Sequence, residues 1–200
     1  MNRVLSSFVI VCLIAHFSMA QNETLDFSKG KNRLFLCEGT PQSKGLKFSL
    51  RYPEKWESVT PDRPNIACKI ANDSTGSVQI MVMVRKLPQI PDSDELEYLQ
   101  SREAVLDALL SDFPNSIELI VEDNHKIEGE SAVFAFYKTD VKRLDHVFEI
   151  SSYNYFFIYK DFRIGLSAGV SVSKGKDSKM LYEKYINIFK LIASSFCHTK

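Results

Sequence analysis

Four β-strand patterns joined by short turns fill the second half of the chain, and they restrict its fold more than any other feature. One turn is marked by Gly129 and another by Lys160 and Asp161. The strand patterns cover residues 117–122, 132–137, 147–159 and 163–172. Strands joined by turns this short pair as antiparallel neighbours. The sequence therefore predicts an antiparallel sheet over this region.

Three further strand patterns come earlier in the chain. Leu46, Phe48, Leu50 and Tyr52 share one face of an alternating segment that Pro53 ends, because proline cannot donate to a strand ladder. A second strand is predicted over residues 66–70, and a third over residues 78–84. The third is almost wholly apolar, which is typical of a strand covered on both faces.

Two segments have the apolar spacing of helices. Asp92 and Glu95 have the spacing of a capping box, and Pro114 ends the periodic segment that follows them. A closing helix is predicted to begin near Asp177 or Ser178. Its apolar stripe consists of Leu181, Tyr185, Ile188, Phe189, Ile192 and Phe196. The element order β-β-β-α-β-β-β-β-α predicts an α+β sandwich, in which helices pack on an antiparallel sheet of about six to seven strands.

Residues 1–20 have the composition of a cleavable secretory signal. Arg3 is their only charged residue, an apolar run follows, and Ser18 and Ala20 supply small side chains before a cut at Gln21. The apolar run is shorter than the roughly 20 residues that span a bilayer. We therefore expect a secreted or periplasmic protein with no membrane span after cleavage. Residues 21–45 are expected to form an irregular lead-in, and residues 46–200 a single domain.

The charge balance argues against a nucleic-acid partner. The chain carries 25 Lys and Arg and 25 Asp and Glu residues, and the leader removes only Arg3 from these. Binding to phosphate backbones needs a clustered basic surface, and no such cluster stands out in the sequence.

Three cysteines remain after cleavage: Cys37, Cys68 and Cys197. An oxidising compartment favours one disulfide, with Cys37–Cys68 as the first expectation and Cys37–Cys197 as the rival. The alternative is three free cysteines that pack as small apolar side chains. Asn22 and Asn72 begin glycosylation sequons, which matter only in a eukaryotic source.

No catalytic, cofactor-binding or metal-binding motif is present. His125, His146 and His198 lack the spacing of metal ligands and are expected at surface turns. Cys68 could pair with a distant histidine as a nucleophile, but its strand setting argues against this.

Aromatic residues offer the main candidate for a contact surface. Tyr153, Tyr155 and Tyr159 crowd one strand, and Trp56 follows the first strand of the domain. They could belong to a buried core. They could instead line a cleft for a peptide or a small apolar ligand.

The segment Phe48–Trp56, which reads Phe-Ser-Leu-Arg-Tyr-Pro-Glu-Lys-Trp, resembles the opening of PsbP-like domains, a superfamily that includes Mog-type and DcrB-like proteins. Residues 126–132 and 192–196 are similar to two later motifs of that superfamily, so the resemblance spans residues 46–197. It implies the PsbP-like fold and a role in binding or assembly, and it carries over no catalytic residue.

These observations together favour an exported, non-catalytic binding or assembly protein without a cofactor. Its partner is expected to be another protein or a small apolar ligand. A secreted hydrolase with a dispersed catalytic site is the alternative, because a single sequence cannot reveal residues that only the fold brings together.

Overall fold

The computed structural model describes residues 22–61, 63–72, 77–116, 118–173, 175 and 177–199. The expected signal sequence and its cleavage site lie outside these residues. None of the described helices combines the length and the hydropathy that a bilayer span requires.

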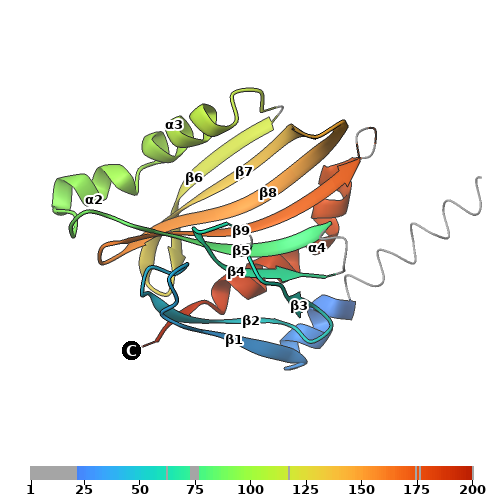
Figure 1. Ribbon diagram of the computed structural model, residues 1–200, viewed down its shortest axis with the longest axis horizontal. Helices are drawn as coiled ribbons and strands as arrows, with labels where there is room; N and C mark the ends of the chain where they lie inside the picture. Colours follow the sequence, from blue (N-terminus) through green and yellow to red (C-terminus); the bar gives the residue numbers. More distant parts are fainter. Residues whose placement is uncertain are drawn as a thin grey trace, which may run out of the picture.

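A seven-stranded antiparallel sheet forms the centre of the molecule (Figure 1). Its strands follow the order β3-β4-β5-β9-β8-β7-β6. They are β3 (Glu57–Ser58), β4 (Ile66–Ala71), β5 (Val78–Lys86), β6 (Glu118–Ile127), β7 (Glu130–Arg143), β8 (His146–Tyr159) and β9 (Phe162–Ser173). Every neighbouring pair is antiparallel. The predicted antiparallel sheet is therefore confirmed.

A second sheet has the order β1-β2-β10, formed by β1 (Asn32–Glu38), β2 (Lys47–Pro53) and β10 (Cys197–His198). The expectation of an irregular lead-in is wrong here, because residues 22–28 are helical and β1 pairs with β2 along its whole length. Only Cys37 of β1 is buried. An edge strand that buries so little shows no clear alternation, so only its backbone pairing reveals it.

The helices lie on opposite faces of the large sheet. From α4 (Ser178–Ser194), Ile188, Phe189 and Ile192 are buried in the main core between β2 and the large sheet. On the other face, α3 (Arg102–Asp112) packs on β6 and β7, where Val105 and Leu109 belong to a smaller core. The predicted α+β sandwich is confirmed.

Asp92 and Asp177 cap helices where the sequence predicts that helices begin. The segment before Pro114, predicted as one helix, forms two. The Asp92 side chain accepts a hydrogen bond from the Glu95 N–H at 2.9 Å and begins α2 (Ser93–Leu99). Ser101 then caps α3 by accepting from the Ala104 N–H at 3.2 Å. A serine that satisfies this backbone donor gives the second helix its own start. The prediction of one continuous helix is therefore wrong.

Candidate functional site

The aromatic residues predicted as a contact surface belong mainly to the core. The exposed fractions of Trp56, Tyr153 and Tyr155 are 0%, 5% and 9%, and Tyr159 is half-buried. The Trp56 ring contacts the Phe189 ring of α4 edge-on, with 6.4 Å between centroids. Residues this deeply buried cannot form a contact surface, so the alternative assignment of Trp56, Tyr153 and Tyr155 to the core is correct.

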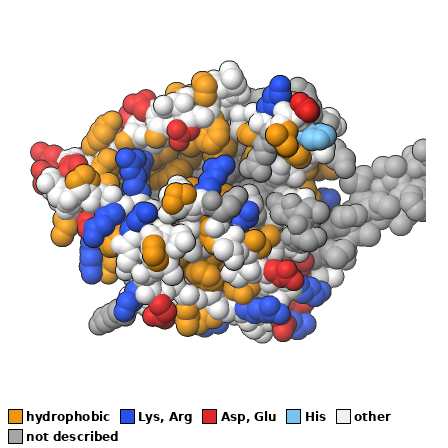
Figure 2. All heavy atoms as spheres, viewed as in Figure 1, with side chains coloured by type: hydrophobic (Ala, Val, Ile, Leu, Met, Phe, Trp, Pro, Cys, Tyr) orange, Lys and Arg blue, Asp and Glu red, His pale blue; other side chains and the backbone are white. Residues whose placement is uncertain are grey.

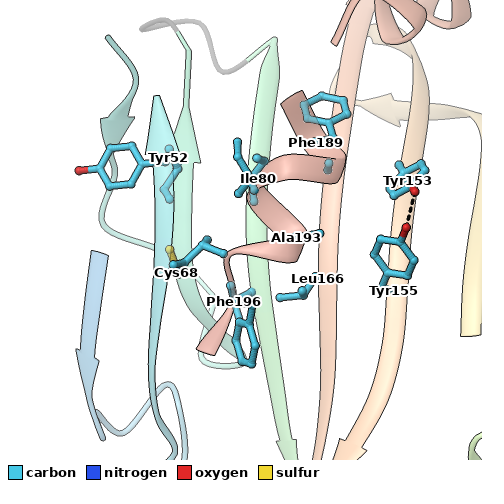
Figure 3. Close-up of a cluster of buried hydrophobic side chains, with 14 of the residues drawn as sticks. Tyr52, Cys68, Ile80, Tyr153, Tyr155, Leu166, Phe189, Ala193 and Phe196 are labelled. Carbon is cyan, nitrogen blue, oxygen red and sulfur yellow. Dashed lines mark hydrogen bonds between the residues drawn. The ribbon is translucent and has the colours of Figure 1, made fainter. Parts of the chain in front are cut away.

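The tyrosine cluster also leaves no room for an apolar ligand. The hydroxyls of Tyr153 and Tyr155 are hydrogen-bonded to each other at 2.5 Å within the core (Figure 3). Burial raises the pKa of Tyr153, and the hydrogen bond with Tyr155 raises it further. The cavity beside them has a volume of about 10 Å³, which is enough for about one water molecule.

All three described cysteines are free thiols, so the predicted disulfide is absent from the structure. Cys37 and Cys68 are buried, and the Cys37 thiol donates a hydrogen bond to the Leu46 carbonyl at 3.6 Å. Burial raises the pKa of Cys68 strongly, and Cys37 adds to this effect. A thiol held in its neutral form is a poor nucleophile, which argues against Cys68 as a catalytic residue.

His198 does not lie at an exposed turn, so that prediction is wrong for this residue. It lies on β10, where its ring stacks on Tyr159 with 3.5 Å between centroids and its Nδ1 pairs with the Glu128 carboxylate. His125 lies on β6 and is half-buried, whereas His146 begins β8 and is exposed. Backbone pairing of β10 with β2 brings His198 inward, and this pairing leaves no sequence signal.

Cys197, His198 and Glu128 are the described groups that come nearest to a catalytic arrangement. A hydrogen bond with Glu128 raises the pKa of Cys197, so the nucleophilic thiolate is disfavoured. The Nε2 atom of His198 is buried and has no hydrogen-bond partner among the described residues. Among the described residues, no group of three or more His, Cys, Asp and Glu side chains could hold a metal ion. This arrangement therefore gives no support to a thiol-dependent reaction.

The face of the large sheet opposite α4 is only partly covered in the described residues, and we call it the open face. Val78, Ile80, Val82 and Val84 of β5 point into the core, whereas Gln79, Met81 and Met83 alternate with them and lie on the open face, half-buried. The prediction that both faces of this strand are covered is wrong. The covering helix α3 packs on β6 and β7 and does not extend over β5.

A groove of about 710 Å³ occupies the open face beside β5. Its lining includes Met81 and Met83 of β5, Phe148 and Ile150 of β8, and Gly169 and Ser171 of β9. The two small residues of β9 leave the space above the sheet free. Figure 2 shows a hollow with hydrophobic side chains in its floor and Lys and Arg side chains along one side of it.

The two charged residues among the described lining of the groove are both basic. Arg63 and Lys69 contribute to its lining, and no described Asp or Glu does. Beyond Met83 along the same face of β5 lies Arg85, whose partner in the strand register is Arg163 of β9. Neither arginine has an ion pair or a hydrogen bond from its side chain to any residue in the described ranges. The sequence analysis missed this site because strand register between distant segments cannot be read from the chain alone.

Comparison of the sequence with protein-family models and with curated proteins gave no match. Solved structures do resemble the fold. LpqN of Mycobacterium tuberculosis, described as involved in cell envelope biogenesis, has a TM-score of 0.51 and 14% identity over 86% of this chain and 94% of that protein. The cyanobacterial PsbP protein CyanoP of Synechocystis has a TM-score of 0.49 and 13% identity over 83% of this chain and 92% of that one.

Two other structures are similar at a lower score. The Ran-binding protein Mog1p of Saccharomyces cerevisiae has a TM-score of 0.46 and 10% identity, over 82% of this chain and 94% of Mog1p. A protein of Bacteroides thetaiotaomicron has a TM-score of 0.44 and 14% identity over 85% of this chain, which spans 49% of that protein's length. At these identities the likeness shows the fold alone. The protein therefore shares its α+β fold with LpqN.

Proposed function

We propose that this protein is an exported, non-catalytic binding protein whose ligand occupies the groove on the open face. The observation that carries the proposal is the groove itself. Its volume of about 710 Å³ lies within the range of about 300–1,000 Å³ that is usual for small-molecule sites. The buried tyrosine cluster offers no comparable space.

The composition of the groove suits a ligand with an apolar body. Met81, Met83, Phe148 and Ile150 are half-buried and present apolar surface to the space above β9. Methionine side chains are flexible and polarisable, so they adapt to ligands of different shape. The lining also carries polar side chains, among them Asn65, Gln79 and Ser171, so we expect apolar burial to contribute affinity and polar contacts to orient the ligand.

The proposal of export rests on residues 1–20, which have the pattern of a secretory signal. N-terminal sequencing of the protein secreted by a competent host tests it. We expect the mature chain to begin at Gln21. Soluble exported protein that retains Met1 would rule out a cleaved signal.

Filling the groove from its floor tests the binding function. Gly169 suits this purpose because a Cβ atom there would meet only the Ser151 carbonyl oxygen, at 4.0 Å, and its backbone φ is not positive. The probe is N-phenyl-1-naphthylamine, a neutral apolar fluorophore. We expect Gly169→Val to weaken its binding at least about tenfold, which corresponds to about 1.4 kcal/mol.

The control is Asn187→Ala, at an exposed position of α4 on the opposite side of the large sheet. It should leave the affinity for the probe unchanged. Thermal melting shows whether each variant is folded. A folded Gly169→Val variant that binds the probe as tightly as the original protein would contradict the proposal.

A further inference from the structure

We propose that Arg85 and Arg163 form an anion-binding site just beyond the Met83 end of the groove, so that the ligand is an anionic amphiphile. Such a ligand has an apolar body and a carboxylate, sulfonate or phosphate head. The inference rests on the proposed function, because the same groove would hold the apolar body.

The first argument is the placement of two like charges. Arg85 of β5 and Arg163 of β9 are direct partners in the antiparallel register and lie on the same face of the sheet. Like charges directly opposite each other destabilise a strand pair. No acidic side chain within the described ranges forms an ion pair with either arginine. Within the described ranges, the pair therefore lacks the counter-charge that a purely structural arginine usually has.

The second argument is partial burial. Arg163 is half-buried, and burial lowers its pKa. The charge of Arg85 lowers the pKa further, whereas the Tyr98 hydroxyl of α2 has a smaller, opposite effect. A cation that loses hydration without gaining a partner costs free energy. An anion bound between the two guanidinium groups would offset both the repulsion and the lost hydration.

The third argument is the position of the pair relative to the apolar floor. Met81, Met83 and Arg85 are successive residues on the open face of β5. Residues two apart along a strand are separated by about 6.8 Å. An apolar body over the methionines would therefore place a head group at the arginines. Guanidinium groups bind carboxylate and phosphate oxygens in pairs, which suits such a head.

The charges around the groove agree with this choice of ligand. Arg63 and Lys69 add two positive charges to the lining, and no acidic residue of the described ranges opposes them there. Together with Arg85 and Arg163 they make four basic groups, which would not attract a neutral ligand and would repel a cationic one. An anionic amphiphile uses both the apolar floor and the positive rim.

A pair of probes with one scaffold tests the inference. 8-Anilinonaphthalene-1-sulfonate carries the ring system of N-phenyl-1-naphthylamine plus a sulfonate, so the ratio of their affinities isolates the anionic group. We expect the sulfonate to bind the original protein at least about tenfold more tightly, the gain typical of a charge-assisted contact. This advantage should shrink as sodium chloride is added.

Variants that each remove one positive charge show which residues cause the tighter binding of the sulfonate probe. Arg85→Gln and Arg163→Gln should each lower the affinity ratio about tenfold. Lys190→Gln, at an exposed position of α4 on the opposite side of the sheet, is the matched control and should leave the ratio unchanged. Because Arg85 is exposed and its loss removes a repulsion, Arg85→Gln remains informative even if Arg163→Gln does not fold.

The outcomes separate the two proposals. If the neutral probe fails to bind, or binds Gly169→Val unchanged, the groove is not the binding site and the proposed function fails. If the neutral probe binds in the groove but the sulfonate gives no advantage, only the anion site is wrong. An affinity ratio that both arginine variants leave unchanged would also overturn the anion site.

Competition by amphiphiles of one chain length identifies the head group. Dodecanoate and monododecyl phosphate should displace the sulfonate probe at lower concentrations than dodecyl maltoside, which carries no charge. Whichever of dodecanoate and monododecyl phosphate displaces the probe at the lower concentration shows whether the arginine pair prefers a carboxylate or a phosphate. Equal displacement by the neutral detergent would contradict an anion site.

Discussion

The carboxylate of Glu149 on β8 accepts a hydrogen bond from the backbone N–H of Ser178, the first residue of α4, at 2.8 Å. The Lys138 ammonium of β7 lies 3.1 Å from the same carboxylate. Asp177 caps the helix by accepting from the Lys179 N–H at 3.0 Å. Glu149 therefore holds the beginning of α4 against the sheet and Asp177 caps it, at the end of the helix where the dipole favours negative charge.

This contact predicts a loss of stability in acid. Desolvation raises the pKa of Glu149, but hydrogen bonds from Ser178 and Lys138 outweigh it and hold the pKa below the ordinary value. The folded protein then binds fewer protons than the unfolded chain as the pH falls through the acidic range. Stability from this group is complete above the unfolded pKa of about 4.5 and is lost as pH falls through the lower, folded pKa.

Glu149→Gln should therefore lower the free energy of unfolding at pH 7 by about 1 kcal/mol and flatten its dependence on pH below about pH 5. Urea denaturation at a series of pH values measures both effects. Glu97→Gln, at an exposed position of α2, is the control and should keep the original pH dependence. If the free energy of unfolding of Glu149→Gln falls as steeply with pH as that of the original protein, other groups cause the loss of stability in acid.

The arginine pair predicts a gain in stability when one charge is removed. Arg85→Gln should raise the free energy of unfolding of the ligand-free protein by about 0.2–1 kcal/mol, because it ends the cross-strand repulsion with Arg163. Denaturant unfolding at low ionic strength measures the change, and added salt should reduce it. The exposed Lys190→Gln variant should show no such gain. A clear destabilisation by Arg85→Gln would mean that the arginine has a stabilising contact.

The thiols should differ sharply in reactivity. Cys197 is exposed, whereas Cys37 and Cys68 have exposed fractions of 2% and 1%. In the mature protein under native conditions, 5,5′-dithiobis(2-nitrobenzoic acid) should titrate one thiol well before the other two, although Glu128 raises the pKa of Cys197 and slows its reaction. Cys197→Ser should abolish this early phase. The other two thiols should react only on unfolding. A single thiol in the denatured mature protein would instead reveal a disulfide, and non-reducing peptide mapping would distinguish Cys37–Cys68 from Cys37–Cys197.

The tyrosine pair predicts a stability effect that depends on both hydroxyls. Tyr155→Phe leaves the buried Tyr153 hydroxyl without the partner that it has at 2.5 Å. An unsatisfied buried polar group should cost about 1–3 kcal/mol. Adding Tyr153→Phe should recover part of this loss, because no polar atom then remains unpaired. A double-mutant cycle from chemical denaturation measures the coupling, and strictly additive losses would exclude it.

Much of the secondary structure follows from local patterns in the sequence. The apolar stripe of α4 and its cap at Asp177 are local signals, and so is the two-residue period of β2. These signals depend on side-chain spacing within a few turns or pleats, so one chain is enough to read them. The sequence analysis did not predict the break between α2 and α3, because leucines recur at helical spacing on both sides of Ser101, as Leu99 and Leu106 do. The capping hydrogen bond of Ser101 marks the start of the second helix.

The sequence by itself determined most strands of the large sheet, the closing helix, the antiparallel pairing of successive strands and the resemblance to the PsbP-like fold. Only the tertiary structure decided that Trp56 is buried, that Met81 and Met83 line a groove, and that Arg85 lies opposite Arg163. Local spacing shows which residues can share a face. Which face is covered, and which distant residues meet on it, depends on strand register and helix placement, and these are settled only when the whole chain packs.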